Sequence, residues 1–231
     1  MTKALLRYFK RVCTVVGARL PAPRLHGLQM VLNYMKLGAW MKKHGFRLPR
    51  RVVDREAVFG AVAELVGDEP VLYLEFGVYR GESMRFWSSA LRHPGTKLHG
   101  FDSFEGLPED FDVEGPHVKG TFDVRGNVPV IDDRRVTFFK GWFDEVLPGY
   151  EVPEHDRLVV VMDADLYSST VCVLNKLRPH IKEGTLIYFD NMSRPEHEPR
   201  AFGEFMRESG LRFEAVSADQ SLNCVFFRCL G

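Results

Sequence analysis

The chain has 231 residues, of which 45% are hydrophobic, enough for one large α/β domain or for a core domain with an appendage. Its 31 basic and 31 acidic residues cancel, so a surface that binds nucleic acid by broad phosphate neutralisation is not expected. The four cysteines lack metal or redox spacing, and we interpret them as small core residues of a reducing, cytoplasmic protein. No apolar run approaches the roughly 20 residues needed to span a bilayer, so no integral membrane segment is expected.

Residues 1–50 are predicted to form a helical appendage in front of the main domain, 51–231. Apolar residues recur with helical spacing over 1–16 and over roughly 25–44, and two prolines separate the two stretches. The appendage could cover a substrate pocket, shield one face of a sheet, or join two copies of the chain as a homo-oligomer. A helix lying on a membrane surface is the alternative, although amphipathic helices usually pack on protein.

Strands and helices alternate through the rest of the chain. Short apolar runs bounded by turn signals predict strands at 71–76, 97–102, 136–140, 157–163, 185–190, 211–217 and 223–229. Helical periodicity predicts helices at about 54–66, from the turn at Gly81 to about 93, at 167–181 and at about 199–209. Five alternations closed by an antiparallel pair predict an α/β fold with a doubly wound, mostly parallel, seven-stranded, Rossmann-like sheet.

Four of the five parallel strands are expected to end in a carboxylate: Glu75, Asp102, Asp163 and Asp190. The carboxyl ends of strands line the ligand crevice of an open α/β sheet. Four acids at one edge repel one another and require positive compensation from a ligand or metal. The long segment 103–132 joins two of these strands, and a loop of that length in a compact domain is usually functional.

The glycine pattern of the first turn indicates what that crevice binds. Gly77 and Gly81 fit neither the G-x-G-x-x-G of diphosphate binders nor a P-loop. A cofactor with a ribose but no diphosphate fits better, and S-adenosylmethionine is the commonest. Gly77 would admit its methionine part, Glu75 would lie near its amino group, and Asp102 would accept hydrogen bonds from the ribose hydroxyls. A nucleotide, another ligand, or none at all are the alternatives.

A second group of polar residues indicates a metal. Asp163 and Asp190 end strands that should be neighbours, and Asn191 follows directly. Two carboxylates and an amide oxygen suit a magnesium ion that keeps several waters. Such an ion could bind vicinal substrate oxygens and lower the pKa of a hydroxyl. Asp165 has a competing interpretation as the cap of the helix that starts near Tyr167.

Five motifs then occur in one order: LEFGVYRGES, GFDSFEGLPE, GWFDEVLP, MDADLYSST and a strand ending in FDN. Together, over about 71–210, they resemble the macrocin O-methyltransferase family, which methylates sugar hydroxyls of macrolide antibiotics. The resemblance implies a class I methyltransferase fold, S-adenosylmethionine and a magnesium ion. Residues 1–50 and the loop 107–130 show no such match, and these regions would choose the substrate.

The resemblance also implies roles for individual residues. The implied cofactor residues are Glu75, Gly77, Tyr79 and Ser83 at the first turn, Asp102 and Ser103 at the ribose, and Trp142 and Phe143 near the adenine. The implied metal ligands are Asp163, Asp190 and Asn191. At the end of the strand predicted at 185–190 the family usually has two acids in a row. Here the first is Asp190, and Asn191 takes the place of the second. Its oxygen can still ligate, but it adds no charge, so metal affinity should fall.

His117 and Asp163 are the predicted catalytic residues. A histidine with a pKa near neutral is the usual proton acceptor, although His117 could equally be a solvated loop residue. His197 and Arg194 could also reach the substrate, whereas His99 lies inside a strand and is expected to be packed.

The sequence therefore predicts a magnesium-assisted O-methyltransferase for a small hydroxylated substrate, such as a sugar of a natural product or glycan. Two alternatives stay open: a non-catalytic member that binds a ligand or partner, and a related hydroxylase-like or lipid- or glycan-modifying protein on the same fold.

Overall fold

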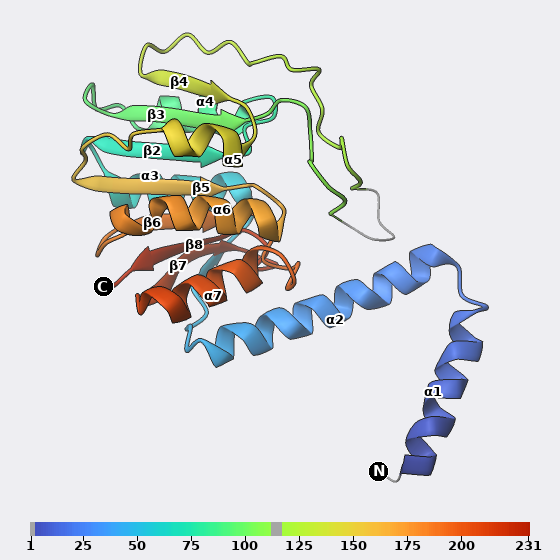
Figure 1. The fold of residues 1–231 in the computed structure, drawn as a ribbon. Coiled ribbons are helices and arrows are strands. Elements are labelled where there is room, and N and C mark those ends of the chain that lie inside the picture. Colours follow the sequence, from blue (N-terminus) through green and yellow to red (C-terminus); the bar gives the residue numbers. More distant parts are fainter. Residues whose placement is uncertain (1–2, 112–116) are drawn as a thin grey trace.

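A central sheet with helices on both faces, and two long helices reaching away from it, make up the computed structural model, which describes residues 3–111 and 117–231 (Figure 1). The α-helices are α1 Lys3–Gly17, α2 Ala22–Lys43, α3 Arg55–Val66, α4 Glu82–Ala90, α5 Phe143–Val146, α6 Tyr167–Leu177 and α7 Glu198–Ser209, with 3-10 helices at Leu147–Gly149 and Arg178–His180. The strands are β1 Arg50–Val52, β2 Val71–Phe76, β3 Lys97–Asp102, β4 Val136–Lys140, β5 Arg157–Met162, β6 Leu186–Phe189, β7 Phe213–Asp219 and β8 Val225–Cys229.

The strand order is β1-β7-β8-β6-β5-β2-β3-β4, and β8 runs antiparallel to both of its neighbours while the other pairs are parallel. The predicted doubly wound α/β class is confirmed, and all seven predicted strands are present. The eighth, β1, was not predicted because three residues are too few to show a period. After β2 the chain moves to β3 and β4 on one side, and β5 then returns to the other side of β2. A ligand crevice is expected at this reversal, at the carboxyl ends of β2 and β5.

Alternating side chains of the central strands build one core on each face. In β5, Leu158, Val160 and Met162 pack on the side of α5, α6 and α7. Val159 and Val161 point to the side of α3 and α4. Because both faces are covered, the strand reads as a continuous apolar run, which is why it could be predicted from sequence.

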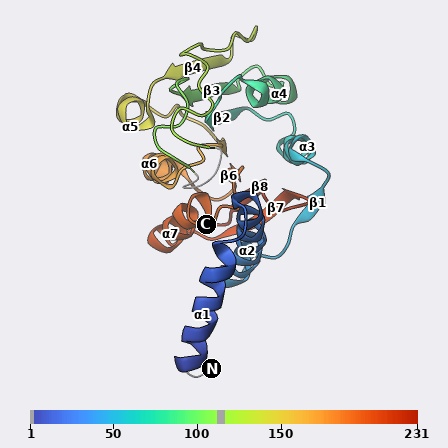
Figure 2. The ribbon, with the colours of Figure 1, turned by 90° about the vertical axis from the view of Figure 1, so that its right-hand side faces the viewer.

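The two N-terminal helices differ in how much they contact the body. α1 has no buried residue, and Leu5 and Phe9 are among its exposed apolar side chains. The C-terminal half of α2 packs on the domain, where Trp40 meets the rings of Phe202 and Phe227 at 6.2 and 6.4 Å. Figure 2 shows α1 extending beyond the body. The division at residue 50 and the covering or oligomerising role of this segment stay predictions.

Within the described residues, no helix is long and apolar enough to cross a membrane.

The turn after β2 makes the tightest backbone contact at the crevice. Gly77 has φ +92°, and a Cβ on it would lie 1.9 Å from the carbonyl oxygen of Asp163. In addition, the amide of Asp163 donates to the carbonyl of Phe76 at 2.9 Å. Only glycine satisfies both the positive φ and the close approach. The ends of β2 and β5 are thereby held against each other.

Gly77→Ala should therefore destabilise the fold by about 3 kcal/mol, because the methyl group must push the Asp163 backbone away. Urea unfolding measures the change. Gly60→Ala is the matched control, since Gly60 lies in α3 and a methyl group added there would meet nothing within 4 Å. An unfolding free energy equal for both variants would contradict the packing described for this turn.

Candidate active site

A cavity of about 800 Å³ lies at the carboxyl ends of β2, β3, β5 and β6. Residues within 103–111 and 117–122, called the roof below, line one side of it, and residues 141–145 form another wall. The roof is tied down by the hydrogen bond from Ser168 Oγ to Glu109 Oε1, at 2.6 Å, and by packing of Leu107 and Phe111 on Leu166. A volume of this size accommodates a nucleoside cofactor together with a small second molecule.

Most of the predicted site residues line this cavity. The lining includes Gly77, Tyr79, Asp102, Ser103, His117, Trp142, Phe143, Asp163, Asp190 and Asn191. Glu75 and Ser83 are not part of it. The topology thus brings together residues that follow β2, β3, β4, β5 and β6, as expected from the strand ends, together with His117 from the loop after β3. Their individual roles stay predictions.

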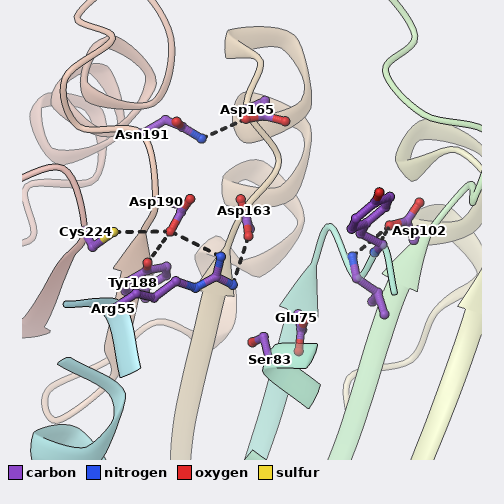
Figure 3. Close-up of polar contacts among 12 residues, drawn as sticks. Arg55, Glu75, Ser83, Asp102, Asp163, Asp165, Tyr188, Asp190, Asn191 and Cys224 are labelled. Atoms are coloured by element: carbon purple, nitrogen blue, oxygen red, sulfur yellow. Dashed lines mark hydrogen bonds and ion pairs between the residues drawn. The ribbon is translucent and has the colours of Figure 1, made fainter. Parts of the chain in front are cut away.

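Asp102 holds the glycine turn in place. Its Oδ2 accepts hydrogen bonds from the amides of Val78 and Tyr79, each at 2.7 Å, and its Oδ1 accepts one from Phe104, also at 2.7 Å. Figure 3 shows this side chain at the end of β3. A carboxylate has further lone pairs, so it can still accept a ribose hydroxyl. In this structure the Asp102 side chain has a structural role, since it fastens the β2 turn to β3.

Glu75 lies beneath the turn, on the side of α3 and α4, because it shares a face of β2 with Tyr73. The Tyr73 hydroxyl donates to Glu75 Oε2 at 2.7 Å, and Ser83 Oγ is 3.4 Å from that hydroxyl. Burial raises the pKa of Glu75 to about 8, and the hydrogen bond from Tyr73 opposes the rise. A role of Glu75 or Ser83 near the cofactor would therefore be indirect.

Arg55, which the sequence did not single out, lies between the two acids predicted to hold a metal (Figure 3). Its Nη2 is 3.1 Å from Asp163 Oδ2, and its Nη1 is 3.6 Å from Asp190 Oδ1. Asp190 also accepts hydrogen bonds from the Tyr188 hydroxyl and, at 3.4 Å, from Cys224 Sγ. The positive compensation expected for the acidic edge thus comes in part from the protein itself.

Asn191 faces the other way, toward Asp165. Its Nδ2 donates to Asp165 Oδ1 at 2.7 Å, and its backbone amide donates to the buried Glu198 at 2.8 Å. The expectation that Asp165 caps α6 is wrong: the capping position is Leu166, and no side chain caps this helix. Asp165 instead has φ +58° and turns its carboxylate toward Asn191.

The predicted metal ligands do not fit a divalent ion as they are arranged. One oxygen of each carboxylate, Asp163 Oδ2 and Asp190 Oδ1, lies against the Arg55 guanidinium, which occupies the place between these two oxygens. Among the described residues, no group of three His, Cys, Asp or Glu side chains is placed to hold a metal. Magnesium binding stays a prediction.

The charge of the cavity is acidic. Among the described lining residues, seven are acids (Asp102, Glu109, Asp144, Glu145, Asp163, Asp165 and Asp190) and three are bases (Arg55, Lys119 and Arg194). Burial and the Asp190 carboxylate raise the pKa of Asp163, and Arg55 opposes that rise. Burial lowers the pKa of Arg55, but Asp163 and Asp190 raise it more, so the guanidinium stays charged. The cavity therefore favours a positively charged ligand.

The three histidines considered for the site, His117, His197 and His99, have different surroundings. His117 lines the cavity, where its ring stacks on Phe122 at 5.6 Å. His197 joins the roof to α6, because its Nδ1 accepts from the Tyr167 amide at 3.3 Å and its Nε2 lies 3.1 Å from the Phe111 carbonyl. His99 is packed, as expected, with Nδ1 2.7 Å from the Tyr150 hydroxyl, and burial lowers its pKa to about 4.

Comparison with known proteins identifies relatives of the chain. The family model described as macrocin-O-methyltransferase (TylF) matches residues 55–229. An 8-demethyl-8-(2,3-dimethoxy-alpha-L-rhamnosyl)-tetracenomycin-C 4'-O-methyltransferase of Streptomyces olivaceus is 33% identical over 137 residues, 51% of each chain. The demethyldecarbamoylnovobiocin O-methyltransferase of Streptomyces niveus is 26% identical over 185 residues, 71% of this chain and 70% of that one.

A solved structure shares the fold as well. The O-methyltransferase NovP superposes with a TM-score of 0.56 at 25% identity, over 77% of this chain and 78% of its own. The chain spans about half the length of the tetracenomycin-C relative.

The buried Glu75 generates a pH prediction. Its pKa of about 8 in the folded chain exceeds the roughly 4.3 of an unfolded glutamate, so the folded state binds the proton more tightly between these values. Stability contributed by the protonated group is therefore lost as pH rises from about 4 through 8. Glu75→Gln should remove this loss and be more stable than the wild type at pH 9 by on the order of a few kcal/mol.

Urea unfolding at pH 5, 7 and 9 measures the difference. The exposed Glu64→Gln, on α3, is the matched control and should follow the wild type. If the Glu75→Gln and wild-type stabilities ran parallel over this pH range, Glu75 would not be a buried neutral acid.

Proposed function

The chain belongs to the macrocin-O-methyltransferase family, and on this premise we propose that it methylates a sugar hydroxyl of a glycosylated natural product with S-adenosylmethionine. One observation carries the proposal: a single cavity contains both the Asp102-fastened glycine turn and the Asp163–Asp190 pair. A methyl donor held at the glycine turn would lie beside an acceptor held at the Asp163–Asp190 pair.

The cavity fits the donor chemically. Gly77 and Tyr79 present the turn to the cavity, Asp102 and Ser103 lie at the end of β3, and Trp142 offers an aromatic wall. When bound, S-adenosylmethionine supplies a methyl group on a positively charged sulfur, which suits the acidic lining. We therefore assign the turn and the β3 end to the methionine part and the ribose.

Asp163 is our proposed proton acceptor for the hydroxyl. It lies at the cavity wall, and its raised pKa makes it a better base than an ordinary aspartate. His117 in the roof is the alternative acceptor, since it lines the same cavity. Holding the hydroxyl in line with the methyl group would supply much of the catalysis.

The relatives support the substrate class. The tetracenomycin-C enzyme is named for a rhamnosyl hydroxyl, and the second relative for a novobiocin precursor. We infer a similar acceptor here, a glycosylated small molecule. A cytoplasmic location, assembly through α1 and α2, and use of magnesium stay predictions. A non-catalytic ligand-binding role would be favoured only if the donor bound without turnover on any acceptor.

Calorimetry with S-adenosylhomocysteine is the first test of the proposal. We expect binding with a dissociation constant below about 100 μM. Incubation with S-adenosylmethionine and a panel of rhamnosylated and other deoxysugar-bearing natural products should give a product one methylene unit heavier. No binding at that concentration would refute the proposed donor.

Asp163→Asn should lower turnover by about 100-fold or more while leaving S-adenosylhomocysteine affinity within a few-fold of the wild type, because it removes the proton acceptor and not the donor site. The exposed Asp156→Asn is the matched control and should behave as the wild type. Equal losses of turnover and affinity would contradict the assignment of Asp163 to the acceptor.

A further inference from the structure

We infer that Arg55 is a built-in cation: its guanidinium supplies the positive charge between Asp163 and Asp190 in place of a divalent metal ion. The inference rests on the proposed function for its role in methyl transfer, although the cation site itself can be tested without turnover.

The position of Arg55 is fixed by its place in the fold. It is the first residue of α3, and Asp54 caps that helix by accepting a hydrogen bond from the Ala57 amide at 2.9 Å. The next turn of α3 buries Val58 and Phe59 in the core. The backbone that carries the guanidinium therefore cannot move freely away from the cavity.

Aromatic rings hold the side chain as well. The guanidinium carbon lies 5.2 Å from the centre of the Phe59 ring and 6.0 Å from that of Tyr188. Both distances are within the range of cation–π attraction. The side chain is 37% exposed, so Arg55 is partly enclosed and still reaches the cavity that it lines.

A metal ion bound between Asp163 Oδ2 and Asp190 Oδ1 would have to displace this guanidinium. Magnesium requires oxygen ligands at about 2.0–2.1 Å in near-octahedral geometry. The nearest oxygens of Asp163 and Asp190 are instead 3.1 and 3.6 Å from two nitrogens of one planar group that stands between them. An ion placed there would meet both the volume and the charge of the guanidinium, and the two cations would repel each other.

The neighbouring side chains are consistent with one internal cation. Asp190 Oδ1 already accepts hydrogen bonds from Tyr188 and Cys224. Asn191 is neutral and directs its Nδ2 to Asp165. The two carboxylates and the guanidinium leave one net negative charge, which the positively charged donor would offset.

A guanidinium in this place makes a distinct contribution to the reaction. It has five N–H donors in a rigid plane, so those not directed at the carboxylates can donate to acceptor oxygens and orient the hydroxyl. Arg55 is thus a positioning residue that also keeps Asp163 next to the reacting hydroxyl. It does not acidify the hydroxyl as a bound metal would.

Manganese binding measured by electron paramagnetic resonance tests the inference directly. The wild-type protein should bind Mn²⁺ no tighter than about millimolar. Arg55→Ala should bind it at least ten-fold more tightly, because the carboxylate pair is uncovered. Adding Asp163→Asn to Arg55→Ala should abolish the gain. The exposed Arg47→Ala, which does not line the cavity, is the matched control and should behave as the wild type.

Turnover gives a second readout. Wild-type methylation should be unaffected by EDTA, and Arg55→Ala should lose at least ten-fold in turnover and regain part of it with added Mg²⁺. S-adenosylhomocysteine binding reports the proposed function separately. Micromolar Mn²⁺ binding by the wild type, or loss of its turnover in EDTA, would overturn the inference. If Arg55→Ala did not fold, Arg55→Gln and the wild-type titration would give the same decision.

Discussion

The contact between the β2 turn and the end of β5 is the constraint on which the site depends. A glycine at position 77 lets the backbone approach the Asp163 carbonyl more closely than any side chain would allow. Asp102 then fastens the same turn to β3 through the backbone amides of Val78 and Tyr79. Three strand ends are thereby held together, and the cavity lies between them.

Charge sets the second condition. Acids at neighbouring strand ends repel one another in a half-buried setting, and the fold offsets this repulsion with a cation from the first turn of α3. Arg55 neutralises only part of the excess negative charge, because acids still outnumber bases among the described residues that line the cavity. The remainder matches a positively charged methyl donor, so the same electrostatics stabilise the site and select its ligand.

Local patterns predicted the parts of this structure that depend on neighbouring residues. The strands at 71–76, 97–102 and 136–140 were predicted to the residue, because each is an apolar run bounded by turn residues. The meeting of Asp163 with Asp190 followed from parallel strand order. Arg55 could not be predicted, since it precedes these motifs and reaches them only through the packing of α3. Glu75 is buried because strand alternation places it on the same face of β2 as Tyr73, whereas its place beside a glycine turn favoured a position in the cavity.

We propose that donor and acceptor share one cavity, with the donor at the Gly77 turn and the acceptor at the Asp163–Asp190 pair. A crystal structure of the S-adenosylhomocysteine complex tests it most directly. We expect the ribose beside Asp102, the adenine near Trp142, and the sulfur facing Asp163, with open cavity left between the sulfur and Asp190. Density for the ligand outside this cavity, or a sulfur directed away from the acid pair, would contradict it.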